Sequence, residues 1–333
     1  HSGLFEQIIA KENLFAAWRE FQVGKMRKTD VAAFAEKFEY HLVDLYHDLE
    51  GSSYRHGAYT RFTIQDPKFR KIAKASVRDR VLHHAICRIL MPIYDKKFIF
   101  DSYSSRKEKG THRATERFQR FAWRLSRNNT RPVWILKCDI RKFFESVDHN
   151  ILLDLCRTTV DDERVLSLLA NIIRSFSAQS GCGIPLGNLT SQLFANVYLN
   201  ELDQYVKREL RCKNYIRYTD DFVLLSSSRA ELENMLPRIR TFLQEELHLE
   251  LHPHKVEFRR WHQGVDFLGY NLFPHFQIVR TKTKRRIMRK LQQRLGDARE
   301  GKIEMENFNQ IKQSYLGVLS HGRSKGLRRS IFK

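Results

Sequence analysis

The stretch that decides the fold spans residues 214–225 and has the sequence NYIRYTDDFVLL. Aromatic and β-branched residues flank the acidic pair Asp220-Asp221 on both sides, a pattern that predicts a strand, a tight turn and a second strand. Two adjacent carboxylates on a stiff turn repel one another, so such a pair is either solvated or holds a cation. Because apolar residues run up to the pair on both sides, we expect a hairpin buried in a sheet with only its tip in water.

A second acidic stretch lies upstream, at residues 133–144, with the sequence VWILKCDIRKFF. Its near-continuous apolar run ends at Asp139, which is typical of a central strand that carries a carboxylate at its end. Three carboxylates from two neighbouring strands can hold two Mg²⁺ ions, the arrangement used for in-line phosphoryl transfer. We therefore expect two Mg²⁺ ions as cofactors, with Mn²⁺ as an acceptable substitute.

The composition points to a polyanionic partner. The chain has 333 residues and a formal net charge of +21, from 59 Lys and Arg against 38 Asp and Glu, and such an excess usually indicates a nucleic acid. An anionic membrane is the competing partner, but we find no apolar run of the ~20 residues that a membrane span needs. The five cysteines are widely spaced, with no CxxC pair. This argues against a disulfide framework and a zinc site, and predicts a cytoplasmic location.

Three motifs resemble those of reverse transcriptases. Residues 218–221 (YTDD) resemble the catalytic Tyr-x-Asp-Asp box, residues 139–144 resemble the first catalytic motif of the palm, and residues 183–192 (GIPLGNLTSQ) resemble the template-and-nucleotide motif between them. The resemblance implies an α+β right-hand polymerase fold, with fingers, a palm built from an antiparallel sheet plus helices, and a short helical thumb. It also implies an RNA-directed DNA polymerase that binds template RNA, the RNA–cDNA duplex and dNTPs.

Three subdomains are expected. Residues 1–130 would form an N-terminal extension and the fingers, residues 131–275 the palm with inserted fingers elements, and residues 276–333 the thumb. Hydrophobic spacing predicts mostly helical structure over residues 1–50. Further helices are expected over residues 77–95, 112–128, 161–177, 188–210 and 229–248.

The resemblance assigns roles to the acidic residues and to one lysine. Asp139 and Asp220 would bind both Mg²⁺ ions, Asp221 would assist, and the Ile140 carbonyl would complete a coordination shell. Lys255 matches a lysine in the fourth palm motif, where it could protonate the departing pyrophosphate. A surface lysine without a catalytic role is the alternative for Lys255.

Further roles follow from the same resemblance. The expected nucleotide-binding residues combine a basic fingers hairpin, an aromatic steric gate and the motif between the carboxylates: Lys68, Arg70, Phe144, Leu186, Gly187 and Gln192. The expected template and primer contacts lie in the fingers, the palm motif, a primer-grip hairpin and the thumb: Arg106, Ser191, Phe267, Leu268, Gly269, Lys284, Arg285, Arg289 and Lys290. The alternatives are an ordinary charged turn for the hairpin, core packing for the aromatic gate and a solvated helix face for the thumb cations.

The motif between the carboxylates departs from the usual family pattern, which has Gln-Gly and then Ser-Pro. Leu186-Gly187 and Ser191-Gln192 occupy these places. This departure resembles the reverse transcriptases of bacterial and phage diversity-generating retroelements, which are related to those of group II introns. That subfamily implies error-prone copying of a structured template RNA and a basic pentameric accessory variability protein. The alternatives are a bacterial defence or group II intron-like reverse transcriptase, and a catalytically inactive RNA-binding scaffold.

Overall fold

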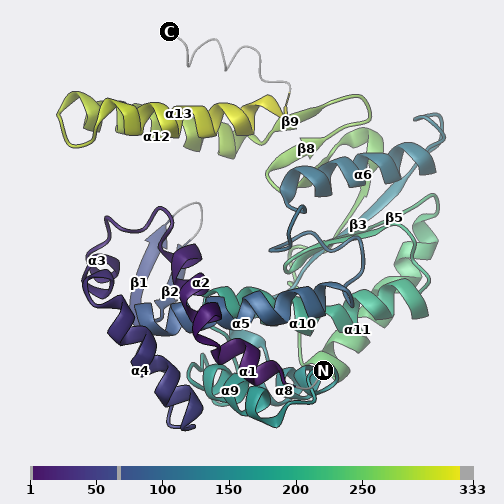
Figure 1. Cartoon of the computed structure of the whole chain (residues 1–333). Coiled ribbons are helices and arrows are strands. Elements are labelled where there is room, and N and C mark those ends of the chain that lie inside the picture. Colours follow the sequence, from purple (N-terminus) through teal and green to yellow (C-terminus); the bar gives the residue numbers. More distant parts are fainter. Residues whose placement is uncertain (1–2, 66–68, 323–333) are drawn as a thin grey trace.

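Three groups of elements make up the fold, which we describe from a computed structural model that covers residues 3–65 and 69–322. Figure 1 shows N-terminal helices and the β1–β2 hairpin on one side, the sheet that contains β3 and β5 on the other, and the long C-terminal helices α12 and α13 across the top. Within the described residues, no helix combines the length and the apolar character needed to cross a bilayer.

The central sheet contains four antiparallel strands in the order β4-β5-β3-β6. The interior strands β3 and β5 are almost entirely buried, which explains why their sequences are nearly continuous apolar runs. The predicted hairpin around the acidic pair is confirmed as β4 and β5. The strand bounds are β3 Trp134–Asp139, β4 Tyr215–Tyr218, β5 Asp221–Ser226 and β6 Glu257–Arg260.

The two faces of this sheet bury two separate cores, because successive strand residues point to opposite sides. Leu136 and Leu224 belong to the larger core, together with the helices beneath the sheet. Ile135 and Val223 belong to the smaller core, together with the C-terminal helices. The helix α6 packs against β4 and β5, and α11 packs against β3 and β5.

The N-terminal region is helical, as predicted, and leads into the predicted hairpin. Strands β1 and β2 pair from Thr60 with Lys74 to Gln65 with Phe69. Helix α5 begins where expected because the Ser76 side chain accepts a hydrogen bond from the Asp79 amide, which caps a free backbone donor. The bounds are α1 Leu4–Ile9, α2 Lys11–Gln22, α3 Thr29–Glu36, α4 Phe38–Glu50, β1 Thr60–Gln65, β2 Phe69–Lys74 and α5 Val77–Asp95.

Three of the predicted helices end earlier than expected. The helix predicted over residues 161–177 ends at Arg174. The helix predicted over residues 112–128 ends at Leu125, and residues 127–129 have the positive φ angles of a turn. The helix predicted over residues 188–210 changes at Tyr205 into a π-helix, whose wider turn the apolar spacing did not reveal. The bounds are α6 Thr111–Leu125, α7 Phe143–Ser146, α8 His149–Arg157, α9 Glu163–Arg174, α10 Leu189–Gln204, the π-helix η1 Tyr205–Glu209 and α11 Arg229–Leu247.

The C-terminal region starts with a small sheet and ends with the two long helices. Leu268 and Gly269 form the β7–β8 turn with φ of 50° and 88°, the backbone of a tight hairpin. The expected α+β right-hand fold is confirmed, and the division into fingers, palm and a thumb formed by these two helices stays a prediction. The bounds are the short helix η2 Trp261–Gln263, β7 Val265–Phe267, β8 Tyr270–Leu272, β9 Gln277–Val279, α12 Thr281–Arg299 and α13 Met305–Ser320.

Candidate active site

The three acidic residues of the sequence motifs meet at one end of the central sheet. Asp139 is the last residue of β3 and Asp221 is the first of β5, and the two are direct partners across the antiparallel pair. Asp220 precedes Asp221 at the β4–β5 turn, and its carbonyl accepts a hydrogen bond from the Ile140 amide at 3.2 Å. Facing residues on antiparallel strands lie about 5 Å apart, so sheet register brings together carboxylates from distant parts of the sequence.

The carboxylates of this cluster repel one another. Burial, with a smaller contribution from the nearby carboxylates of Asp220 and Asp139, raises the pKa of Asp221 to about 6 despite the opposing charge of Lys137. Asp139 is 7% exposed, and its Oδ1 lies 2.5 Å from the Lys255 ammonium. The lysine thus supplies a positive charge to a group of carboxylates that repel one another.

The donor chemistry of this cluster fits Mg²⁺ or Mn²⁺, which prefer carboxylate oxygens. No three acidic, histidine or cysteine side chains form a ready-made metal cage anywhere in residues 3–65 and 69–322. Lys255 contacts one carboxylate oxygen of Asp139, so this oxygen would be free for a cation only when the ion pair opens. The metal roles of Asp139, Asp220, Asp221 and the Ile140 carbonyl therefore stay predictions, as does proton donation by Lys255.

A cavity of about 540 Å³ lies between the fingers hairpin and the palm. Its lining includes three residues that the sequence assigned to the nucleotide, namely Arg70 from β2, Phe144 from α7 and Leu186 from the loop before α10. Lys68 lies outside the described residues. The exposed Gln192 is not part of the lining.

Gly187 is exposed, yet its loop passes close to the fingers hairpin. Its φ is 108°, and a Cβ there would lie 3.0 Å from the Ile72 side chain, so the loop passes too close to the fingers hairpin for a larger residue. From the sequence, we expected that the missing side chain of Gly187 lets a nucleotide or template approach the backbone closely. The structure shows that it also lets the palm loop contact β2.

Asn188 is a structural residue that sequence reasoning missed. Its side chain accepts a hydrogen bond from the Ala75 amide at 3.2 Å and donates one to the Ala73 carbonyl at 2.9 Å. The Ala73 amide in turn donates to the Leu186 carbonyl at 3.3 Å. These bonds tie the loop that carries Leu186 to the fingers hairpin, and only its position just before a helix could have drawn attention to this asparagine.

Arg106, the predicted template contact, is used inside the protein in this structure, and its template role stays a prediction. Its side chain is 6% exposed and forms an ion pair with Asp95 at 2.5 Å. It also donates to the carbonyls of Ile99 and Ser102 at 2.6 Å and 3.0 Å. A guanidinium with these internal acceptors clamps the fingers loop and is not presented to a phosphate backbone.

Two further predicted contacts are buried. Ser191 is 2% exposed within α10, and its hydroxyl has no hydrogen-bond partner among the described residues. Phe267 is fully buried, with its ring centroid 5.6 Å from that of Phe118. Burial keeps both side chains from the surface in this structure, and their predicted primer or template contacts stay predictions. Leu268 and Gly269 lie at the turn beyond Phe267, and the Gly269 carbonyl accepts from the Arg280 amide at 3.0 Å, which joins the hairpin to the thumb.

The predicted thumb contacts all lie on α12. Arg285 and Arg289 are exposed one helical turn apart, whereas Lys284 and Lys290 are half-buried. If this face follows a duplex backbone, replacing Arg285 and Arg289 with Gln should reduce the log–log salt slope of duplex binding by up to ~2 units. Fluorescence anisotropy at several salt concentrations measures this slope.

Matched replacements on other helices provide the control for the thumb. Arg157 of α8 and Arg238 of α11 are also exposed, and changing both to Gln removes the same charge far from α12. This pair should leave the slope nearly unchanged. Equal slopes for all three proteins would mean that the α12 face is merely solvated.

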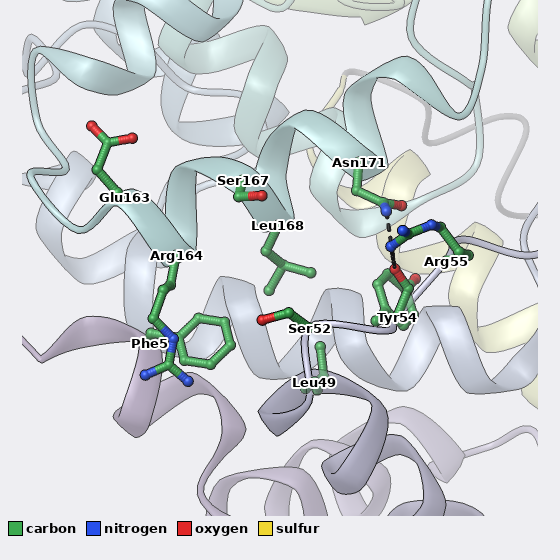
Figure 2. Close-up of a pocket in the computed structure, with 10 residues that line it drawn as sticks. All are labelled: Phe5, Leu49, Ser52, Tyr54, Arg55, Glu163, Arg164, Ser167, Leu168 and Asn171. Carbon is green, nitrogen blue, oxygen red and sulfur yellow. Dashed lines mark hydrogen bonds between the residues drawn. The ribbon is translucent and has the colours of Figure 1, made fainter.

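A second cavity lies away from these residues. Figure 2 shows its lining side chains, which come from α1, α4, the segment after α4 and α9. The cavity has a volume of about 220 Å³. Arg164 stacks over the Phe5 ring at 3.8 Å, and Asn171 donates to the Tyr54 carbonyl at 3.1 Å. None of the residues assigned to catalysis or nucleotide binding lines this cavity.

The comparison with protein families decides the identity. The family model described as reverse transcriptase (RNA-dependent DNA polymerase) matches residues 64–272, well over half of the chain. The chain belongs to the reverse transcriptase family. The three carboxylates of this reverse transcriptase lie within the matched region, and so does most of the lining of its large cavity.

Relatives of this reverse transcriptase include proteins of group II introns. Protein YkfC of Escherichia coli (strain K12) is 28% identical over 245 residues, which cover 62% of this chain and 63% of that protein. The group II intron-encoded protein LtrA of Lactococcus lactis subsp. cremoris is 21% identical over 273 residues, covering 62% of this chain and 44% of LtrA. The chain therefore spans less than two thirds of the length of these relatives. An apo telomerase structure from Candida tropicalis aligns with a TM-score of 0.49 and 12% identity, covering 67% of this chain and 55% of that one.

Proposed function

We propose that this reverse transcriptase is an active RNA-directed DNA polymerase that copies RNA with dNTPs. The observation that carries the proposal is the pairing of Asp139 with Asp221 across β3 and β5, with Asp220 on the adjoining turn. Two Mg²⁺ ions bound there would activate the primer 3′-hydroxyl and neutralise the triphosphate and the leaving pyrophosphate. Asp139 and Asp220 would hold these ions, and Asp221 would assist.

Other residues would hold the nucleotide around this centre. Arg70 is exposed on β2 where it lines the large cavity, so it can contact a triphosphate from the fingers side. Phe144 forms part of the palm side of the same cavity. Lys255 is 38% exposed on its side chain, and it can turn toward the leaving group once its partner Asp139 binds a metal.

The direct test is primer extension by the purified chain. A DNA primer on an RNA template, supplied with dNTPs and Mg²⁺, should be extended to the template end. A chain that binds the primer–template but extends nothing with either Mg²⁺ or Mn²⁺ would instead support an inactive RNA-binding scaffold.

We further propose that the enzyme serves a diversity-generating retroelement, because Leu186, Gly187 and Gln192 match that subfamily's variant of the palm motif. The proposed partners are a structured template RNA and a basic pentameric accessory protein. The similarity to LtrA favours a second candidate, a group II intron-like polymerase. Errors concentrated at template adenines would support the retroelement role, and even errors over all bases would support the intron-like role.

Leu186 provides a prediction on fidelity. Leu186 is half-buried and lines the large cavity, but its side chain offers no hydrogen bond to a nascent base pair. Leu186→Gln should lower misincorporation at template adenines by about fivefold, since an added directional hydrogen bond is worth ~1 kcal/mol and ~1.4 kcal/mol is a factor of ten. Sequencing cDNA made on an adenine-rich RNA measures this error rate.

Leu186→Met is the matched control, because Met keeps a similar volume without an amide. It should retain the wild-type error spectrum. If Leu186→Gln stays active and copies adenines as poorly as the wild type does, fidelity is set elsewhere.

A further inference from the structure

Beneath the acidic turn lies a fully buried arginine. Arg217 is on β4, and neither its side chain nor that of its ion-pair partner Asp203 from α10 is exposed at all. The guanidinium bonds Asp203 with two parallel contacts, from Nε to Oδ1 and from Nη2 to Oδ2, each 2.7 Å long. Tyr215 donates to the same carboxylate at 2.8 Å, so the negative partner is fixed as well.

The remaining donors of Arg217 point toward the turn and the segment beside it. Nη1 donates to the Thr219 carbonyl at 3.2 Å and to the Asn196 side chain at 3.3 Å, and Nη2 donates to the Ser102 hydroxyl at 3.1 Å. A guanidinium has five N–H groups, and these five contacts use all of them. A charge that is fully buried is tolerated only when it is paired and hydrogen-bonded in this way.

Thr219 needs this support because of its backbone. It is a β-branched residue with φ of 54°, a conformation that such residues avoid and that persists only when the surroundings enforce it. Arg217 holds its carbonyl, and the Ser104 hydroxyl accepts a hydrogen bond from its side chain at 2.7 Å. The next residue is Asp220, whose carbonyl the Ile140 amide holds from the other side.

The segment of residues 101–104, which lies beside β4, is hydrogen-bonded to the backbone of the same arginine. The Arg217 amide donates to the Asp101 carbonyl at 3.0 Å, and the Tyr103 amide donates to the Arg217 carbonyl at 2.9 Å. Asn196 donates to the Ser104 carbonyl at 2.9 Å. The fingers segment, α10 and the β4–β5 turn therefore share one buried centre.

We propose that Arg217 is a positioning residue that holds the Thr219–Asp220 turn in its strained form and so fixes where the Asp220 carboxylate lies. Asp203 balances most of its charge, so Arg217 acts mainly through geometry, and its remaining attraction to Asp220 helps to hold the same turn. This inference rests on the proposed polymerase activity for its kinetic consequence, but the state of the turn can be measured without that activity.

The main test removes the pair without leaving a buried charge. In Arg217→Met with Asp203→Asn, the asparagine still accepts from Tyr215, while the Thr219 carbonyl loses its donor. We expect hydrogen exchange in residues 214–225 to accelerate at least tenfold and Mn²⁺ binding, followed by electron paramagnetic resonance, to weaken several-fold. We also expect kcat to fall about 100-fold with KM for dNTPs within twofold, because displacing a reacting group by ~1 Å has effects of this size.

Two additional variants keep the proposal open to refutation. Arg78→Met with Asp48→Asn removes a partly buried fingers ion pair and should change none of these quantities. Arg217→Lys keeps a charge for Asp203 but lacks the planar fork that reaches Thr219, so it should lower kcat like the double variant even if the latter fails to fold. Either of two results would overturn the positioning role. One is a folded double variant with the exchange rates, Mn²⁺ affinity and kcat of the wild type; the other is Arg217→Lys with the wild-type kcat.

The same experiment separates this inference from the proposed function. If wild-type protein extends no primer while the double variant still shows faster exchange in residues 214–225, the polymerase proposal fails and the positioning role stands. If wild-type protein is active and the turn is equally protected in all variants, the positioning role fails and the polymerase proposal stands.

Discussion

Asp220→Asn is expected to lower primer extension with dNTPs and Mg²⁺ on the order of 10³-fold. The substitution removes a negative charge and keeps the shape of the side chain. A bound metal contributes several kcal/mol of transition-state stabilisation, and losing ~4 kcal/mol of it corresponds to a factor of about 10³. Asp139→Asn should have a similar effect, since this residue stands on the neighbouring strand of the same cluster.

Thermal unfolding tests independently whether Asp220→Asn keeps its fold. Like charges crowd this cluster, and the carboxylates of Asp220 and Asp139 help to raise the pKa of the buried Asp221. Removing one charge relieves part of this repulsion, so Asp220→Asn should unfold at the same temperature as the wild type or a higher one. A loss of activity would then not be a loss of fold.

Asp154→Asn is the matched control, because this exposed carboxylate of α8 pairs only locally, with Arg157 at 3.1 Å. It should leave extension unchanged. Near-normal extension by Asp220→Asn would contradict the assignment of the catalytic carboxylates, and equal losses in both variants would indicate a general defect.

Phe144→Ala is expected to raise the use of ribonucleotides relative to deoxynucleotides by roughly 10- to 100-fold. Phe144 is half-buried, lines the large cavity, and meets the Phe143 ring edge-on at a centroid distance of 5.3 Å. Its carbonyl accepts from the Ile184 amide at 2.8 Å, which fixes the backbone. A fixed ring under the sugar selects against a 2′-hydroxyl by exclusion, and discrimination by pocket size is worth ~1–3 kcal/mol.

The measurement is the ratio of kcat/KM for each ribonucleotide and its deoxynucleotide on one primer–template. Phe176→Ala is the matched control, since Phe176 lines the same cavity without a predicted role at the sugar. An unchanged ratio in Phe144→Ala would mean that this ring is core packing. A rise in both variants would mean that cavity volume alone sets the selection.

Local patterns in the sequence were sufficient for most of the elements. The alternation around residues 214–225 predicted the β4–β5 hairpin, and the apolar run ending at Asp139 predicted β3, because strand spacing and turn chemistry act over a few residues. Helix α5 was predicted with its observed bounds for the same reason. Where helices ended early, at Leu125 and Gln204, the cause was a change of backbone conformation that hydrophobic spacing does not encode.

The sequence by itself thus determined the α+β class, the order of the elements, the strand ends that carry Asp139 and Asp221, and the turn that carries Asp220. Only the tertiary structure decided which charged and polar side chains are used internally. Arg106 clamps a loop, Lys255 pairs with Asp139 across 116 positions, and Arg217 reaches Ser102 across 115. The physical reason is that burial and hydrogen-bond partners depend on segments far apart in the chain. The sequence shows a charge, whereas only the fold shows whether a partner inside the protein already satisfies it.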